Sequence, residues 1–345
     1  MLSSPSPFKY VLTAYSLPHS MGYLPTQNGA FCATPLSVLD LMDAAVNLGL
    51  AGVEIPLTAR VPSFNGVIVE TPALPPDLAG ELQSRNLRLI ADYGALLDYD
   101  VQHTKDYLDL AARSGTTIVR AILSHLLCGD RRKLAGGWEA HRSALAVRLR
   151  ELLPFAHERG ITLALENHQD AANEDFWWLY EQTGKSPAFG ITLDTGNPLA
   201  VGQDPVLSAR QLAPLIRHVH LKDYTLHFAP NGYRLVRCAA GDGVIDFPAI
   251  LEILRTNGHD LLPGIEIAAQ QTRTVPLLEA SWWQEYPARE ATTLLPLLQR
   301  LWALGKPENA PYSSAWERGE SSEAVLKEEW EVLTRSSHYF HGLTE

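Results

Sequence analysis

Short apolar runs alternate along this chain with longer segments that have helical periodicity. Eight of the runs have the length and the aliphatic content of buried parallel strands. They cover residues 8–15, 52–56, 87–93, 117–123, 161–167, 189–194, 218–221 and 262–267. Between them lie amphipathic segments such as residues 34–49 and 141–160. Strict alternation predicts a parallel sheet of the α/β class, and eight strand–helix units predict its closure into a (β/α)8 barrel.

The ends of several helices can be predicted from single residues. Thr34 followed by Pro35 fits a helix start, because Thr caps helix N-termini and Pro suits the first turn. Gly49, Gly160 and Gly258 fall where helices should end, and glycine readily takes the left-handed conformation of such a cap. These helices are therefore expected to stop just before the strands that follow them.

The chain has no linker rich in Gly, Ser or Pro that would divide it into separate domains. We expect a single catalytic barrel domain over residues 1–300. Extra C-terminal helices over residues 301–345 are expected to pack on the barrel or at a subunit interface. The stretch from Tyr224 to Gly243 is too long and too polar for an ordinary strand-to-helix loop, so we expect it to cover the active-site mouth.

Four of the apolar runs in the second half of the chain end in a side chain that can bind a metal. These residues are Glu166, Asp194, His220 and Glu266. Side chains alternate between the two faces of a strand, and in all four runs the bulky aliphatic residues share one face while small or polar residues share the other. We therefore expect the four side chains to point into the barrel at its carboxyl-terminal end, where such barrels keep their active sites.

Two Glu, one Asp and one His form an oxygen and nitrogen ligand set suited to Mn, Mg, Co or Zn. Taken singly, each residue has an ordinary alternative role, because a buried carboxylate is usually part of an ion pair and a buried His is usually a core residue. Taken together, three carboxylates in one apolar enclosure repel one another unless a cation or protons neutralise them. The set therefore predicts one divalent metal ion.

Composition excludes several other classes of protein. The 345 residues carry a net charge of −11, which argues against nucleic acid or an anionic membrane as a partner. The three Cys are far apart and form neither a disulfide framework nor a metal-binding pair, as is typical of a reducing cytoplasm. The first residues lack the features of a signal peptide, and no apolar run reaches membrane-spanning length. We therefore expect a cytoplasmic globular protein.

Five motifs lie in order along the second half of the chain: LALENH with Glu166, TLDTGN with Asp194, HVHLKD with His220, GDGVIDF, and GIEI with Glu266. In these motifs the chain resembles the xylose isomerase-like TIM-barrel superfamily of sugar isomerases and epimerases. That group includes D-tagatose 3-epimerase-like enzymes and inosose dehydratases and isomerases. The resemblance covers about the whole barrel, and it is specific for the fold and the metal site but poor for the substrate.

The resemblance implies that Glu166, Asp194, His220 and Glu266 bind one divalent ion, with Mn first and Mg, Co or Zn as alternatives. It further implies that Glu166 and Glu266 form the acid/base pair, which removes a proton beside a metal-bound carbonyl and yields an enediolate. The expected reaction is isomerisation or epimerisation of a sugar, keto-sugar or cyclitol. The same first step would serve a lyase, either a dehydratase or a deglycosidase of 3-keto sugars and glycosides. A sugar-binding barrel without activity is a third hypothesis.

One position departs from the family's pattern. Many of its epimerases, and endonuclease IV, carry a His three residues after the Asp of the sixth strand, where this chain has Asn197. Asn can hydrogen-bond a substrate hydroxyl, but it is not a general base and is a poor ligand for a second metal. Glu54 and Asp92 also stand where the nuclease has histidines, so a trinuclear nuclease site is not expected.

Six further residues are expected to contact a small carbohydrate substrate, because they lie on inward faces or at strand ends. They are His168, Asn197, Lys222, Glu54, Asp92 and Arg120. Each has a structural alternative, such as supporting a metal ligand for His168 or an exposed loop position for Lys222. The sequence leaves open whether the substrate is phosphorylated and whether the protein forms a homo-oligomer.

Overall fold

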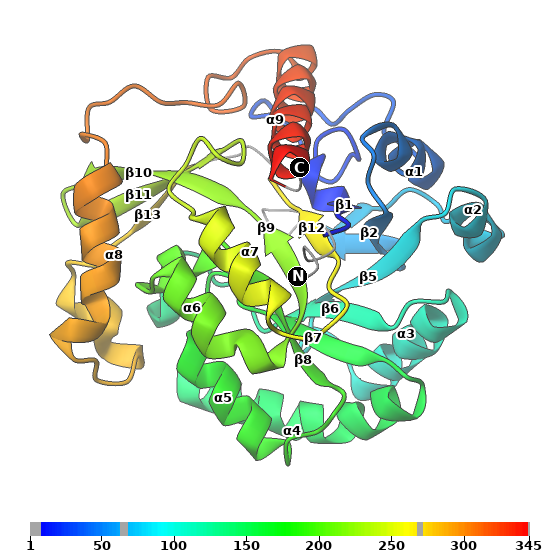
Figure 1. The fold of residues 1–345 in the computed structure, drawn as a ribbon, viewed down its shortest axis with the longest axis horizontal. Helices are drawn as coiled ribbons and strands as arrows, with labels where there is room; N and C mark the ends of the chain where they lie inside the picture. Colours follow the sequence, from blue (N-terminus) through cyan, green and yellow to red (C-terminus); the bar gives the residue numbers. More distant parts are fainter. Residues whose placement is uncertain (1–7, 63–67, 268–271, 344–345) are drawn as a thin grey trace, which may run out of the picture.

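Eight parallel strands close into a barrel, as the alternating pattern predicts. The computed structural model describes residues 8–62, 68–267 and 272–343. The barrel strands are β1 (Val11–Thr13), β2 (Gly52–Pro56), β5 (Arg88–Ala95), β6 (Ile118–Ile122), β7 (Thr162–Glu166), β8 (Phe189–Asp194), β9 (Ile216–Leu221) and β12 (Pro263–Ile265). Each pairs with its neighbours in that order, and β12 returns to pair with β1 (Figure 1). All eight predicted strands are confirmed.

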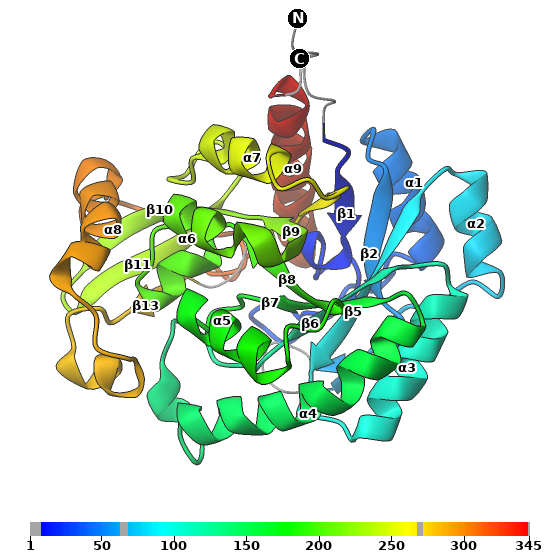
Figure 2. The same ribbon diagram turned by 60° about the horizontal axis from the view of Figure 1, so that its bottom comes forward.

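Helices surround the barrel on its outer side (Figure 2). They are α1 (Val38–Asn47), α2 (Leu78–Ser84), α3 (Val101–Arg113), α4 (Trp138–Glu158), α5 (Asn173–Gln182), α6 (Pro205–Leu212) and α7 (Phe247–Arg255). Short 3-10 helices lie at Ala14–Ser16, Arg131–Lys133, Asn197–Val201, Ala213–Leu215 and Ala280–Glu285. Leu163 and Leu165 of β7 and Leu149, Leu152 and Leu153 of α4 are buried between the two layers.

The predicted start of the first helix is wrong by one turn. The helix α1 begins at Val38, where Ser37 rather than Thr34 is the N-cap. Ser37 accepts a hydrogen bond from the Asp40 backbone, and the Asp40 carboxylate accepts one from the Ser37 backbone at 2.8 Å. This reciprocal capping box satisfies two free N–H groups, which a Thr at position 34 could not do for a helix that starts four residues later. The predicted helix-ending glycines are left-handed, with φ of 69° at Gly49.

The interior of the barrel changes from apolar to polar along its axis. Val11, Ile90 and Leu262 form a small buried cluster of their own, and the partly buried Ile118 packs against it. Two residues after Val11, Ile90 and Ile118 the inward positions are polar, at Thr13, Asp92 and Arg120. The apolar cluster therefore closes one end of the barrel, and the chemistry-bearing residues gather toward the other.

A three-stranded antiparallel sheet adjoins the barrel. It consists of β10 (Asp223–Ala229), β11 (Gly232–Cys238) and β13 (Arg273–Val275), in the order β10–β11–β13. A small hairpin is formed by β3 (Arg60–Pro62) and β4 (Ile68–Glu70). The stretch expected to be a polar cover is thus mostly a regular hairpin, and most residues of β10 are buried. We call the three strands β10, β11 and β13 the accessory sheet.

Two helices follow the barrel, α8 (Ala291–Leu304) and α9 (Ser322–Gly342). In Figures 1 and 2, α8 lies beside the accessory sheet, and α9 lies beside β1 and β12. Phe340 of α9 is buried against Tyr10 and Phe247, with ring centroids 5.4 and 4.9 Å apart. Glu329 of α9 accepts a hydrogen bond from the backbone of His19 at 2.8 Å. The helix α9 is therefore packed on the barrel of its own chain. In the part of the chain that the structure describes, no helix is both long enough and apolar enough to cross a membrane.

Candidate metal centre and active-site cavity

The four metal-seeking residues of the sequence converge in space. Each offers one ligand atom, and all four atoms lie within 4.8 Å of one another. Glu166 and Asp194 are the last residues of β7 and β8, His220 lies in β9, and Glu266 follows β12 directly. Oxygen and nitrogen ligands bind such metals at about 2.0–2.2 Å, so ligands on opposite sides of one ion are about 4.4 Å apart. The four residues, called the ligand cluster below, are thus close enough for a single ion.

The imidazole of His220 is held between two groups of carboxylates. Its Nε2 lies 2.9 Å from both oxygens of Glu54, and its Nδ1 lies 2.9 Å from Oε2 of Glu266. Burial disfavours the imidazolium, but Glu54 and Glu266 raise the pKa of His220 well above its usual value. Glu54 thus holds Nε2, and Nδ1 is the atom directed at Glu166 and Glu266 of the ligand cluster, where a metal ion would take the place of its proton. Glu54 also contacts His218, whose Nε2 lies 2.9 Å from Oε2.

Glu166 is held from both sides. Nε of Arg120 donates to Oε2 of Glu166 at 2.6 Å, and Nδ2 of Asn197 donates to Oε1 at 3.1 Å. Arg120 also donates to Asp92 at 2.6 Å, so one guanidinium joins two buried carboxylates. Burial alone would raise the pKa of Glu166, but the charge of Arg120 holds it well below its usual range. Glu166 is therefore ionised and fixed in orientation, as a metal ligand needs to be.

Asp194 presents one oxygen to the backbone and the other to the ligand cluster. Its Oδ1 accepts hydrogen bonds from the N–H groups of Gly196 and Asn197 at 2.8 and 2.9 Å. Its Oδ2 lies 2.6 Å from Nζ of Lys222, which is also 3.1 Å from Oε2 of Glu266. Burial favours neutral Lys222, yet these two carboxylates raise its pKa above the usual value. Lys222 is a buried cation of the ligand cluster and not an exposed loop residue.

Three atoms of the ligand cluster lack a hydrogen-bond partner of acceptable geometry within the described residues: Oδ2 of Asp194, Nδ1 of His220 and Oε2 of Glu266. They have close ion-pair partners, but none of those contacts is aligned as a hydrogen bond. Buried polar atoms rarely lack such a partner, and here the three belong to one ligand set. The chemistry and position of these atoms therefore fit a divalent cation.

The buried charges around the ligand cluster point to the same conclusion. The carboxylates are Glu54, Asp92, Glu166, Asp194 and Glu266, and the cationic side chains are Arg120 and Lys222. Five carboxylates thus face two permanent cations. Burial raises the pKa of Asp92 to about 6, which relieves only part of the excess negative charge. A divalent cation would remove most of it.

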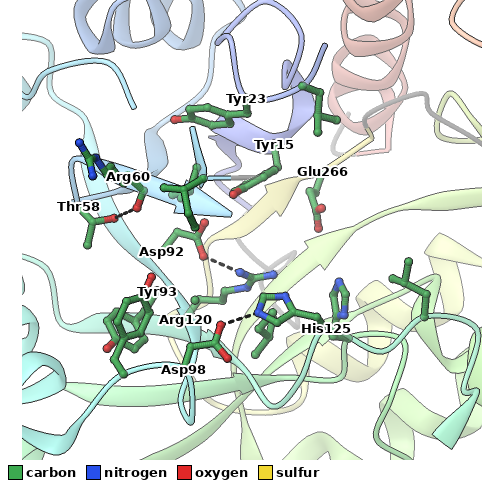
Figure 3. Close-up of a pocket in the computed structure, with 18 of the residues that line it drawn as sticks. Tyr15, Tyr23, Thr58, Arg60, Asp92, Tyr93, Asp98, Arg120, His125 and Glu266 are labelled. Atoms are coloured by element: carbon green, nitrogen blue, oxygen red, sulfur yellow. Dashed lines mark hydrogen bonds and ion pairs between the residues drawn. The ribbon is translucent and has the colours of Figure 1, made fainter. Parts of the chain in front are cut away.

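A cavity of about 510 Å³ lies over the ligand cluster (Figure 3). Glu266 is the one member of the cluster that lines the cavity within the described residues, and it is 8% exposed, whereas the other three members are 0–2% exposed. Asp92, Arg120 and His168 line the same cavity. Burial lowers the pKa of His168 to about 3, so this ring is neutral near pH 7. Glu266 therefore connects the ligand cluster with the space that a substrate would enter.

The six expected substrate contacts fall into two groups. Asp92, Arg120 and His168 line the cavity, whereas Glu54, Asn197 and Lys222 contact members of the ligand cluster. Sequence reasoning did not single out the other lining residues, which include Tyr15, Tyr23, Tyr93, Tyr99, His125, Arg237 and Arg273. Tyr15 and Tyr23 lie on the side of Glu266 in Figure 3, whereas the hydroxyl of Tyr93 is directed at α3, 2.9 Å from Oγ1 of Thr104. The position of Arg237 in the stretch expected to cover the mouth was the one available indication.

The chain belongs to the xylose isomerase-like TIM barrel family, whose model matches residues 42–286. It is 32% identical over 162 residues to 2-epi-5-epi-valiolone 7-phosphate 2-epimerase from Actinoplanes sp., a match that covers 46% of this chain and 58% of that protein. It is 27% identical over 161 residues to inosose dehydratase from Clostridium tetani, covering 43% of this chain and 54% of that protein. The chain thus spans less than two thirds of the length of these curated relatives, which are enzymes of sugar and cyclitol chemistry.

A solved structure with the same fold is that of a xylose isomerase-like TIM barrel protein from Mycobacterium smegmatis in complex with magnesium. The two have a TM-score of 0.55 and 17% sequence identity, and the match covers 86% of this chain and 97% of that one. At this level of identity the similarity shows the fold alone.

Proposed function

We propose that this protein is a divalent-metal-dependent isomerase or epimerase of a keto-sugar or cyclitol. The observation that carries the proposal is the position of Glu266, which belongs to the ligand cluster and also lines the cavity. A carboxylate so placed can take a proton from a substrate whose carbonyl lies over the cluster. The epimerase relative from Actinoplanes and the magnesium complex of the structural neighbour support the reaction class and the metal. We expect Mn²⁺ to be the preferred ion.

In this proposal the residues have distinct roles. A bound divalent ion would supply Lewis acidity that polarises the substrate carbonyl and the adjacent hydroxyl. Glu266 would accept or return the proton on the cavity side, and Glu166 would be its partner, ionised and oriented by Arg120. His168 is neutral and at the cavity, where it can hydrogen-bond a substrate hydroxyl.

The alternative function is that of a lyase, which expels water or an aglycone after the same proton removal. Its specific support is the similarity to inosose dehydratase. Glu266 would again remove the proton, and a second group would have to protonate the leaving oxygen. Tyr15 and Tyr23 line the cavity on the side of Glu266, but burial raises the pKa of both phenols, which makes them weak acids.

The test is incubation of the Mn²⁺-loaded protein in heavy water with ketoses, inososes and 3-keto-glycosides. Uptake of deuterium without loss of substrate mass, abolished by chelation and restored by Mn²⁺, is the expected result. Release of water or of an aglycone would identify the lyase instead. If neither exchange nor elimination occurs with any carbonyl compound, the protein is a binding barrel and both enzyme proposals fail.

Replacing Glu54 with Gln is expected to weaken Mn²⁺ binding by about 10–100-fold, because partners of metal-binding His residues contribute about that much. The carboxylate contacts Nε2 of His220 and fixes which nitrogen faces the ligand cluster. Isothermal titration calorimetry with MnCl₂ measures the effect. The matched control is Glu70→Gln, whose side chain is 83% exposed and which should bind Mn²⁺ as the wild type does. An unchanged affinity in Glu54→Gln would show that Glu54 does not orient His220.

A further inference from the structure

Two arginines of the accessory sheet share one of its faces. Leu235 of β11 is the cross-strand partner of Arg273 in β13, so these two side chains lie on the same face. Arg237 is two residues beyond Leu235 and therefore lies on that face too. Diagonal neighbours of this kind are separated by about 7–8 Å, which is within reach of long side chains. Arg234 of the same strand has the opposite parity and lies on the other face.

Both arginines line the cavity that contains Glu266. Their charges act on one another: burial lowers the pKa of Arg273, and the charge of Arg237 lowers it further. Burial would raise the pKa of Glu266, but Lys222, His220 and Arg237 hold it well below its usual range. The two guanidinium groups are thus within electrostatic reach of each other and of the ligand cluster.

The charges in and below the cavity show what these arginines add. With Arg237 and Arg273 included, four permanent cations face the five carboxylates named above. These groups together have one negative charge too many, and a divalent ion in the ligand cluster would turn this into an excess of one positive charge. The charged groups at the rim compensate each other, since His125 pairs with Asp98 at 2.7 Å and Arg60 with Glu70 at 3.7 Å. A neutral sugar would not balance this excess, whereas an anionic group of the substrate on the side of the accessory sheet would.

We propose that Arg237 and Arg273 bind an anionic substituent, a carboxylate or a phosphate, of the substrate whose carbonyl lies at Glu266. Guanidinium groups bind both anions through paired, charge-assisted hydrogen bonds. A volume of about 510 Å³ is large enough for a six-carbon sugar or cyclitol with such a substituent. The proposal rests on the proposed function only for where the reacting carbonyl lies, and it narrows the substrate class to acidic keto-sugars or cyclitols.

The experiment compares three ketohexoses that differ at one carbon: D-fructose, D-fructuronate and D-fructose 6-phosphate. Dissociation constants are measured for the Mg²⁺-loaded protein by calorimetry. At least one anionic sugar is expected to bind about tenfold or more tightly than fructose, as charged hydrogen bonds allow. The tighter of the two anionic sugars identifies carboxylate or phosphate as the natural substituent. Equal affinity for all three would overturn the proposal.

Three single-residue variants test whether Arg237 and Arg273 cause the preference for anionic sugars. Arg237→Gln and Arg273→Gln should each remove most of the preference for the anionic sugar. Arg234→Gln removes the same charge from the other face of β11 and should keep the preference. Inorganic phosphate serves as a probe that does not depend on the sugar: it should raise the melting temperature of the wild type and of Arg234→Gln, but not of Arg237→Gln or Arg273→Gln. Equal shifts in all four proteins would contradict the proposal.

The two proposals can fail separately. Deuterium exchange with neutral ketoses and no preference for anions would overturn the anion site and leave the proposed function intact. A preference for anions that depends on Arg237 and Arg273, without exchange or elimination, would overturn the proposed function and leave the anion site intact.

Discussion

Replacing Glu266 with Gln is expected to slow solvent deuterium exchange by about 10²–10⁴-fold, the usual contribution of a positioned general base. Glu266 is the member of the ligand cluster that lines the cavity, so its carboxylate is the group that a bound substrate would meet. Gln has the same size and keeps one oxygen for the metal, but it does not accept a proton. Exchange rates by proton NMR, with metal content measured on the same samples, separate loss of the base from loss of the ion.

The control for this prediction is Glu252→Gln on α7, whose side chain is 68% exposed and outside the cavity. It should exchange at the wild-type rate. If Glu266→Gln retains its metal and exchanges within about tenfold of the wild type, Glu266 is a ligand only and another group removes the proton.

Replacing Arg120 with Met is expected to lower the free energy of unfolding by about 3–5 kcal/mol, because it leaves two buried carboxylates without their shared cation. Arg120 lies at 2.6 Å from both Glu166 and Asp92, and all three side chains are nearly or fully buried. Met fills similar space, so the effect reports lost charge compensation and not a cavity. Urea denaturation at pH 8 measures it.

The matched control is Arg88→Met, which breaks an exposed ion pair with Asp260 whose side chains are 50% and 82% exposed. It should change stability by no more than about 1 kcal/mol. The penalty of Arg120→Met should also shrink toward pH 5. Without Arg120, Asp92 and Glu166 have higher pKa values in the folded protein than in the wild type, so the folded variant gains protons, and hence stability, as the pH falls. A loss below about 1 kcal/mol at pH 8 would show that other groups compensate the two carboxylates.

Much of this fold could be predicted because its signals are local. Eight apolar runs mark the barrel strands, and the period of two within each run places Glu166, Asp194, His220 and Glu266 on the inward face. The convergence of these four residues then follows from the closure of the sheet. The start of α1 was missed because Thr34 and Ser37 are both good caps, and the reciprocal bond with Asp40 decides between them.

The rest of the site depends on contacts between distant segments, which no local pattern encodes. From the sequence, Lys222 is expected to contact substrate, with an exposed loop position as the alternative, but the structure buries it between Asp194 and Glu266. Arg237 and Arg273 share a face of the accessory sheet only because β11 and β13, which are far apart in the sequence, pair with each other. The polar composition of the stretch containing Arg237 suggested a loop, although Tyr224, Leu226 and Phe228 alternate with polar residues in the pattern of a strand, β10.

One strand of the accessory sheet, β10, follows a barrel strand through a very short connection. A single residue separates β10 from β9, the barrel strand that contains His220. Glu166 and Asp194 are at the ends of β7 and β8, and neither of these strands is followed directly by a strand of the accessory sheet. The residues that would hold the reacting carbonyl therefore lie at the ends of barrel strands, whereas those that would select the far end of the substrate lie on β11 and β13 of the accessory sheet. Exchanging residues on one face of a hairpin could then redirect this barrel to a new substrate while its proton chemistry stays the same.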